Sequence, residues 1–377
     1  MSQTVRDLHE AAGALFGNVA GVELPRHYGD PSGEYGTAVG AVGVVDRSHR
    51  GRLVLSGKAP IQMLTGVLTG RMPTEQVERP AGGSTGHAEY SAVLTQKGRM
   101  VTDVRAFHTG TSEEERVFLD VPAAGLEALL GHLAKFVPPR LARTEDVTER
   151  TGMLTLVGPG STALIAELGL VDGVTADDLE GLGEDDVISA SGSDAVRVVR
   201  TKVVRGMAYD VFAEGEAVRT LWERAVAAGA RPVGQGVWQT LRVEAGRPAY
   251  GQDMDETTIP YEAGIVERAV DHTKGCYTGQ EVIVRIRDRG HVNRLLRGLL
   301  LGDMPTPAVG VELFHGDEGK TVGRITSAVS SPYFGETIAL AYVRRAVEPR
   351  TSVRVGADGP NAEVRELSEG EWAPRTL

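Results

Sequence analysis

The stretch Lys-Gly-Cys-Tyr-Thr-Gly-Gln-Glu at positions 274–281 contains the only cysteine of this 377-residue chain. A single thiol forms no internal disulfide and cannot supply the several thiolates that hold an iron–sulfur cluster or a structural zinc. Thr278 and Glu281 have the spacing of a capping box, and apolar residues at helical spacing follow, so the sequence predicts a helix from about Gly279. Cys276 would then lie just before a helix N-terminus with Lys274 nearby, and both features favour a thiolate. The alternative is a buried cysteine that fills apolar space.

The composition is that of a globular protein, with 41% hydrophobic and 24% charged residues. A chain of this length predicts two or three domains. The formal net charge of -11 argues against a broad nucleic-acid interface, because phosphates need a basic surface. The polar start Met1–Glu10 and the absence of 18 consecutive apolar residues predict neither a secretory signal nor a membrane span. We therefore expect a cytoplasmic protein that binds no nucleic acid and no membrane.

Outward from the octapeptide, the pattern predicts short elements of both kinds. Tyr90–Leu94 and Arg99–Phe107 are strand-like and are separated by Gln96-Lys97-Gly98, which is a hairpin signal. Apolar residues at helical spacing predict helices at Val5–Leu15 and Ala123–Phe136. A glycine-rich turn joins a strand-like run to a predicted helix at Ser161–Leu168, but it lacks the motifs of phosphate-binding loops. From Leu295 onward, short β-like pieces with glycine and proline are typical of a small barrel.

The octapeptide resembles the signature of the YgfZ family of folate-binding proteins, relatives of the T-protein of the glycine cleavage system. Further blocks resemble T-protein segments in the same order, at 43–48, 98–103, 241–246, 250–256 and 260–264. The resemblance covers about residues 35–365. It implies an α+β fold with two intertwined mixed α+β domains and a C-terminal β-barrel around a central channel. The expected division is an N-terminal extension at 1–34, a folate-binding core at 35–292 and a barrel domain at 293–377.

The same resemblance implies a tetrahydrofolate-binding factor that serves the assembly or maintenance of iron–sulfur enzymes and uses Cys276. Its partners would be the folate and the iron–sulfur client enzymes. One alternative is a folate-dependent aminomethyltransferase, although the Arg200-Thr201 pair is not followed by the T-protein sequence Gly-Tyr-Thr-Gly-Glu. Another is a folate-binding module without catalysis. Turnover of a one-carbon unit separates these classes.

The chemistry of folate suggests which residues bind it. A carboxylate can accept hydrogen bonds from the pterin edge, and arginine suits the anionic glutamate tail. By position in the T-protein blocks, the resemblance implies Asp210 for the pterin and Arg242 for a folate contact. The alternatives are a solvated strand residue for Asp210 and an exposed helix arginine beside Glu244, although residues two apart on a helix do not face each other.

Asp103 stands where T-proteins carry the second of two acids, and Thr102 replaces the first. Its alternative is a cross-strand ion pair on a face shared with Arg105. The candidate catalytic residues are therefore Cys276, Lys274 and Asp103. The candidate folate contacts are Asp210, Arg242, Glu244, Tyr277 and Gln280. No histidine falls in a metal-ligand spacing, so no metal site is predicted.

Overall fold

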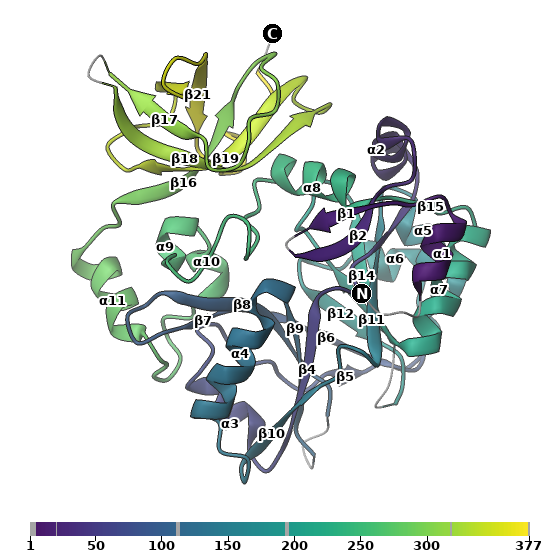
Figure 1. Ribbon diagram of the computed structural model, residues 1–377. Coiled ribbons are helices and arrows are strands. Elements are labelled where there is room, and N and C mark those ends of the chain that lie inside the picture. The colour runs from purple at the N-terminus through teal and green to yellow at the C-terminus, as the bar shows by residue number, and fades with distance from the viewer. Residues whose placement is uncertain (1–4, 20, 111–113, 193–195, 317–318, 376–377) are drawn as a thin grey trace.

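The computed structural model describes residues 5–19, 21–110, 114–192, 196–316 and 319–375. It contains a five-stranded sheet, an eight-stranded sheet, a two-stranded hairpin and a closed barrel. In Figure 1 the barrel lies at the top, and α8 (Gln235–Glu244) lies between it and the eight-stranded part. Within the described residues, no helix is long and apolar enough to cross a membrane.

The five-stranded sheet is antiparallel, and helices α3 (Pro60–Thr65) and α4 (Ala123–Phe136) pack on it. Its order is β10 (Ala142–Asp146), β4 (Gly51–Gly57), β9 (Arg116–Val121), β8 (Met100–His108) and β7 (Glu89–Leu94). The predicted hairpin is confirmed, because β7 pairs with β8 around a turn in which Gly98 has a φ of 71°. Helix α4 has the predicted bounds, with Leu129 and Leu133 buried.

The eight-stranded sheet is antiparallel except where β15 runs parallel to β3. Its order is β15 (Arg231–Pro232), β3 (Gly43–Asp46), β11 (Thr151–Val157), β14 (Ala208–Glu214), β13 (Arg197–Arg200), β12 (Asp186–Ser189), β6 (Ser84–His87) and β5 (Val77–Glu78).

Helices cover both faces of this sheet. Successive residues of a strand point to opposite faces, so neighbouring residues of β3 contact different sets of helices. Val44 packs in a core with α1 (Arg6–Ala11), α5 (Ser161–Leu168), α6 (Ala176–Glu180) and α7 (Gly215–Ala227). Val45 packs in a second core with α2 (Pro31–Gly40) and α8.

The two sheets are intertwined along the chain, as predicted. The chain passes from β3 in one sheet to β4 in the other, returns to the first sheet for β5 and β6, and crosses again for β7. Phe107 and Phe118 of one sheet pack edge-on against Phe212 of the other, with ring centroids 5.6 Å apart in both contacts. Aromatic packing therefore fixes the two sheets against each other.

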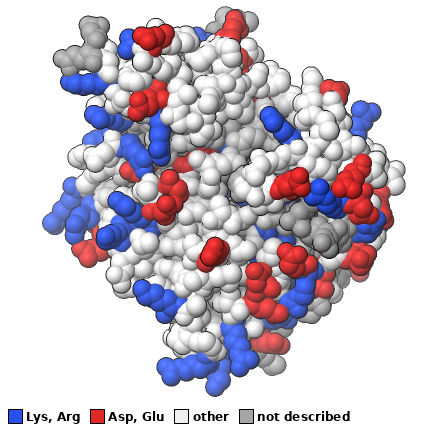
Figure 2. All heavy atoms as spheres, in the orientation of Figure 1, with Lys and Arg blue, Asp and Glu red and all other residues white. Residues whose placement is uncertain are grey.

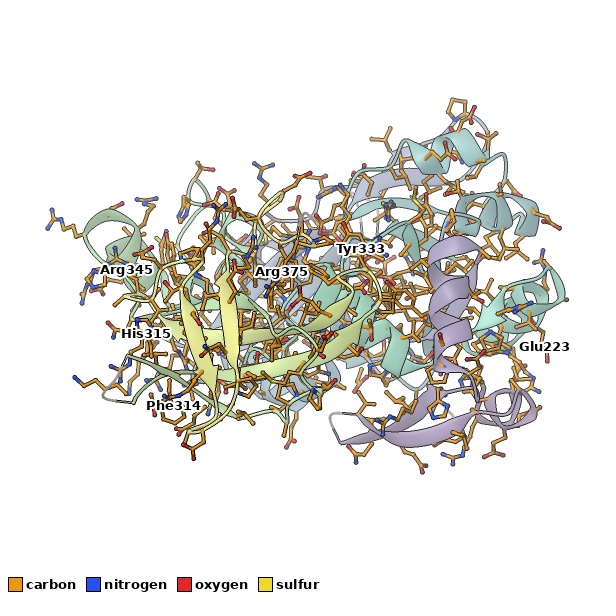
Figure 3. All side chains as sticks on the ribbon, turned by 90° about the horizontal axis from the view of Figure 1, so that it is seen from above. Glu223, Phe314, His315, Tyr333, Arg345 and Arg375 are labelled. Atoms are coloured by element: carbon orange, nitrogen blue, oxygen red, sulfur yellow. The ribbon has the colours of Figure 1, made fainter. Side chains whose placement is uncertain are left out.

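The barrel is a closed ring of six strands, which confirms the predicted terminal barrel. The strands are β16 (Arg294–Leu300), β19 (Glu336–Arg344), β18 (Lys320–Ser331), β17 (Glu312–His315), β20 (Ser352–Val355) and β21 (Asn361–Arg365). Before it come α9 (Pro260–Ala263), α10 (Val266–Ala269) and α11 (Gln280–Arg289). Viewed from above, Tyr333 lies on the side of the barrel nearest the eight-stranded part, where the Arg205 guanidinium stacks 4.0 Å from its ring centroid (Figure 3).

The N-terminal helix is shorter than predicted. It ends at Ala11, and Leu15 begins β1 (Leu15–Val19), which pairs with β2 (Val22–His27). Gly13 separates the two elements with a φ of 81°, a conformation that favours glycine and ends helices. Val5 and Leu8 belong to the same core as Val44, so α1 and the residue before it pack onto the eight-stranded sheet.

Candidate functional site

A cavity of about 750 Å³ lies where the two sheets, α8 and the barrel meet. This is the position expected for the central channel, and the volume suits a cofactor-sized molecule. The lining residues used below come from β7, β8, β14, α8, α10 and β18, from the segments 47–50 and 247–252, and from Asp185 just before β12. The β1–β2 hairpin adds Asn18, Val19 and Arg26.

Asp103 brings a carboxyl group to the cavity wall. The Tyr90 hydroxyl donates a hydrogen bond of 2.8 Å to Asp103 Oδ2. The buried Oδ1 has no hydrogen-bond partner among the described residues. Burial raises the pKa of Asp103, and the Tyr90 hydrogen bond and the charge of Arg50 oppose that shift only in part. A buried carboxyl group with free acceptor capacity and a raised pKa is suited to proton transfer.

Thr102 does not face the cavity. A Cβ added at Gly125, in the first turn of α4, would meet Thr102 Oγ1, so the side chain at 102 packs against that helix. Replacement of an acid by threonine at 102 therefore leaves the carboxyl group of the cavity in place.

Arg105 forms the centre of a chain of buried charges, and the predicted alternative for Asp103 is not found. Arg105 pairs with Asp120 at 2.8 Å and with Asp210 at 2.7 Å rather than with Asp103. Arg50 pairs with the other oxygen of Asp120 at 2.6 Å. Burial alone would raise the pKa of Asp120, but these two guanidinium groups hold it below its usual range.

Asp210 lines the cavity, and each of its oxygens already has a partner. Thr155 Oγ1 donates to Oδ1 at 2.6 Å, and Arg105 Nη2 lies 2.7 Å from Oδ2. Its predicted pterin contact remains untested, and a ligand would share these oxygens with the protein.

Asp185 is a cavity residue that sequence reasoning missed. It has a φ of 65°, which is uncommon outside glycine, and the cost of such a conformation is often found at functional positions. Its oxygens lie 3.7 Å from Arg105 Nη1 and 3.9 Å from Arg268 Nη2, beyond hydrogen-bonding distance. The acidic run 184–186 was the only signal for it in the sequence.

Arg242 also lines the cavity, but its guanidinium is fully engaged by the protein. Nε donates to Gln239, Nη1 to the Arg247 carbonyl and to Asp253, and Nη2 to Gln252 and Ser327. Ser327 belongs to β18, so Arg242 connects α8 to the barrel.

Glu244 is not among the residues that line the cavity. It accepts hydrogen bonds from Tyr35, Arg205 and Ser331, and so joins α2 and α8 to the barrel. The predicted folate contact of Glu244 is not brought together with Asp103 and Asp210.

The octapeptide segment is also outside the cavity lining. Cys276 is exposed. Lys274 Nζ donates to the Leu68 carbonyl, and burial lowers the pKa of Lys274 to about 8, although Asp271 opposes the shift. Tyr277 is buried in a core cluster, and Gln280 is the first residue of α11. The structure therefore separates Cys276, Lys274, Tyr277 and Gln280 from the cavity.

The predicted capping box at Thr278 and Glu281 is wrong. Helix α11 has Gly279 as its N-cap, with a φ of 85° and no side-chain hydrogen bond. The Thr278 hydroxyl donates instead to the Gly66 carbonyl. Beyond this cap, α11 carries exposed arginines, and Figure 2 shows basic side chains gathered along that edge.

Two family comparisons match most of the chain. The GCVT N-terminal domain matches residues 5–274, and the glycine cleavage T-protein C-terminal barrel domain matches residues 294–369. The chain belongs to the glycine cleavage T-protein family. The match begins ahead of residue 35 and includes α1 and the β1–β2 hairpin.

Similar proteins of the T-protein family agree over nearly the whole length. An aminomethyltransferase of Rubrobacter xylanophilus is 32% identical, covering 89% of this chain and 85% of that protein. One from Thermus thermophilus is 31% identical and covers 95% of this chain and 93% of that protein. The structure of the glycine cleavage system aminomethyltransferase T from Bartonella henselae has a TM-score of 0.82 at 22% identity, covering 98% of this chain and 99% of that chain, which shows the shared fold.

These matches support the T-protein relation and do not extend to the finer YgfZ assignment. An iron–sulfur role is therefore a hypothesis that rests on the octapeptide.

Proposed function

We propose that this protein binds tetrahydrofolate in the central cavity and acts as a folate-dependent aminomethyltransferase. The observation that carries the proposal is Asp103, a buried carboxyl group on the wall of a cavity of about 750 Å³, with one oxygen that has no hydrogen-bond partner among the described residues. The aminomethyltransferase names of the T-protein relatives support it. So does the placement of Thr102, because the missing acid at that position would not have faced the cavity.

The cavity offers groups that fit a reduced folate. Asp103 Oδ1 has acceptor capacity left, and the oxygens of Asp185 accept no hydrogen bond from the described residues. The donor-rich edge of a pterin suits such carboxylates. Tetrahydrofolate supplies the two amines, N5 and N10, that bond to the one-carbon unit as its bonds to the lipoyl sulfur and to nitrogen break, which releases the lipoyl thiol and ammonia. Asp103, held by Tyr90, takes up or returns the proton at that site.

The test is a transfer assay with the purified protein, aminomethyl-lipoyl carrier protein and tetrahydrofolate, with ammonia and methylene-tetrahydrofolate measured. We expect both products to form at an enzymatic rate. Binding of tetrahydrofolate without products would overturn the transferase proposal and leave a folate-binding module. If tetrahydrofolate does not bind at all, folate is excluded as the ligand of the cavity.

A second candidate is a tetrahydrofolate-dependent factor for iron–sulfur enzymes, and the exposed Cys276 within the octapeptide favours it. Cys276→Ser is nearly isosteric and alters an exposed position, so we expect an unchanged melting temperature. In this candidate, the variant fails to restore iron–sulfur enzyme activity in cells that lack the native gene, while wild type succeeds. Full restoration by Cys276→Ser would exclude a reactive role for the thiol.

A further inference from the structure

Arg47 is a buried cation on the cavity wall, at a position that the proposed function does not use. It follows β3, and only 7% of its surface is exposed. Its guanidinium lies over the ring of Trp238 of α8, with Cζ 3.9 Å from the ring centroid. Arg47 Nε is buried and has no hydrogen-bond partner among the described residues. Natural proteins seldom leave a buried charged donor in this state, because it has lost its water without a replacement.

The other buried or half-buried arginines of the cavity wall have carboxylate partners, whereas Arg26 of the hairpin is exposed. Arg50 and Arg105 share Asp120, and Arg105 also pairs with Asp210. Arg247 and Arg268 share Glu184. No carboxylate of the described residues lies within 4.0 Å of the Arg47 guanidinium. The two carboxylates whose charge acts on it, Asp210 and Asp120, pair with Arg105 and Arg50 instead.

The environment of Arg47 does not neutralise it. Burial lowers the pKa of Arg47 to about 9, and Arg50 adds to that shift, so Arg47 stays charged at neutral pH. Burial, with the charge of Arg47 second, lowers the pKa of His49 to about 3, so that residue is neutral. The Trp238 face attracts the cation, but this attraction is weaker than the cost of removing a charge from water.

Arg242 cannot provide the same contact without breaking existing ones. Its Nε and both terminal nitrogens donate to protein acceptors on α8, the segment 247–253 and the barrel. Arg47 lines the same cavity, and its Nε has no hydrogen-bond partner among the described residues.

We propose that Arg47, held on Trp238, is the anion-recognition residue of the cavity and binds a carboxylate of the ligand. Planar guanidinium and planar carboxylate match in two parallel hydrogen bonds. The inference deepens the proposed function, since it assigns a contact in the same cavity. The carboxylate has two sources, the glutamate tail of the folate or a separate small carboxylic acid that takes part in the transfer.

The test uses two variants. Arg47→Met keeps the apolar contact with Trp238 and removes the charge, and Arg47→Lys keeps the charge but loses the planar guanidinium that can donate two parallel hydrogen bonds. Arg345→Met, at an exposed barrel position, is the control (Figure 3). The probes are (6S)-5-formyltetrahydrofolate, 6-methyltetrahydropterin, which lacks the tail, and glutarate. Calorimetry measures the first two, and thermal shift measures glutarate.

If the tail is the source, Arg47→Met binds 5-formyltetrahydrofolate roughly ten- to a hundredfold more weakly, because a charge-assisted hydrogen-bond pair is lost. The affinity of Arg47→Lys for 5-formyltetrahydrofolate lies between those of wild type and Arg47→Met, and Arg345→Met binds it as wild type does. Affinity for 6-methyltetrahydropterin is the same in all four proteins. If a separate acid is the source, Arg47→Met keeps its affinity for 5-formyltetrahydrofolate, whereas saturable stabilisation by glutarate occurs in wild type and is lost in the variant.

A second readout separates recognition from structure. Removing an uncompensated buried charge leaves a ligand-free protein as stable as wild type or more so, and we expect the melting temperature of Arg47→Met to be equal or higher. A clear fall in that temperature would make Arg47 a structural residue and overturn the proposal. Wild-type affinity for 5-formyltetrahydrofolate together with an unchanged glutarate response in Arg47→Met would also overturn it. Failure of wild type to bind 5-formyltetrahydrofolate rejects the proposed function instead, and the glutarate comparison still decides the role of Arg47.

Discussion

Asp103 and Cys276 show how environment separates two residues that the sequence proposes for the same task. Asp103 is buried beside the cavity; Tyr90 donates a hydrogen bond to one of its oxygens, and the other accepts none from the part of the chain that the structure describes. Cys276 is exposed, and its segment does not line the cavity. A shared direct role in one reaction therefore requires a second molecule that reaches both places.

The Asp103→Asn variant should lose transfer while keeping its fold. We expect the transfer rate to fall about 10²- to 10⁴-fold, the usual contribution of a positioned acid or base. Because the raised pKa of Asp103 means that the native state holds its proton more tightly, ionisation destabilises the protein as pH rises from the unfolded value through the folded one. Asparagine does not ionise, so the variant should melt at or above the wild-type temperature at neutral pH.

The measurements for Asp103→Asn are the transfer rate against pH and thermal unfolding at neutral pH. In wild type, the rate should rise with an apparent pKa above the ordinary aspartate value of about 3.9. An asparagine variant with undiminished transfer would remove Asp103 from the mechanism.

At the scale of elements, Asp120 connects strands that the chain brings together from distant positions. It lies on β9 and accepts from Arg105 of β8 and from Arg50, which precedes β4. Arg105 then reaches Asp210 on β14 of the other sheet. The charge chain thus crosses between the sheets close to where their aromatic rings pack.

The Asp120→Asn variant should be strongly destabilised, because it leaves the buried guanidinium group of Arg105 and the half-buried one of Arg50 without their shared anion. Breaking a buried ion pair in this way costs roughly 3–5 kcal/mol. The lowered pKa of Asp120 contributes stability that is present above the unfolded pKa of about 3.9 and is lost as pH falls through the folded pKa.

Denaturant unfolding of Asp120→Asn, wild type and the exposed control Asp358→Asn tests this from neutral pH to below about pH 4, the region in which a free aspartate titrates. The gap between wild type and Asp120→Asn should narrow as the solution is acidified, and the control should follow wild type. A loss of less than about 1 kcal/mol at neutral pH would contradict the expected role.

For the whole molecule, the barrel completes the cavity through α8. Arg242 donates to Ser327, and Glu244 accepts from Ser331, so two side chains of one helix bind the same strand, β18. The C-terminal Trp372 adds a hydrogen bond of 3.0 Å from its Nε1 to the Val243 carbonyl. Its ring lies where a side chain at Gly298 would otherwise be, so the barrel strand β16 approaches it closely.

Trp372→Ala should loosen the barrel from α8 without unfolding the two sheets. The ring is only partly buried, so the cost should be below the roughly 3–5 kcal/mol of a fully buried large side chain. We expect faster amide hydrogen exchange in β16 and α8, unchanged exchange in the five-stranded sheet, and weaker binding of 5-formyltetrahydrofolate. Unchanged exchange in all three regions would show that Trp372 does not hold this contact.

The sequence by itself determined the elements whose signals are local. Helices α4 and α5 have their predicted bounds because apolar periodicity and neighbouring glycine or proline act within a few residues. The β7–β8 hairpin depends on its own turn. The blocks shared with T-proteins gave the intertwined sheets and the barrel.

Only the tertiary structure decided which side chains meet. Helix α11 begins without the predicted cap because Thr278 finds the carbonyl of Gly66, more than two hundred positions away. Arg242 looked like a ligand contact, but its donors are engaged by acceptors that include Ser327 of the barrel. Arg47 stands in an ordinary polar run of the sequence, and its Nε, which has no partner in the described part of the chain, matters only because Trp238 and the cavity lie beside it. Hydrogen-bond saturation and burial are properties of neighbours in space, which local patterns of residues do not encode.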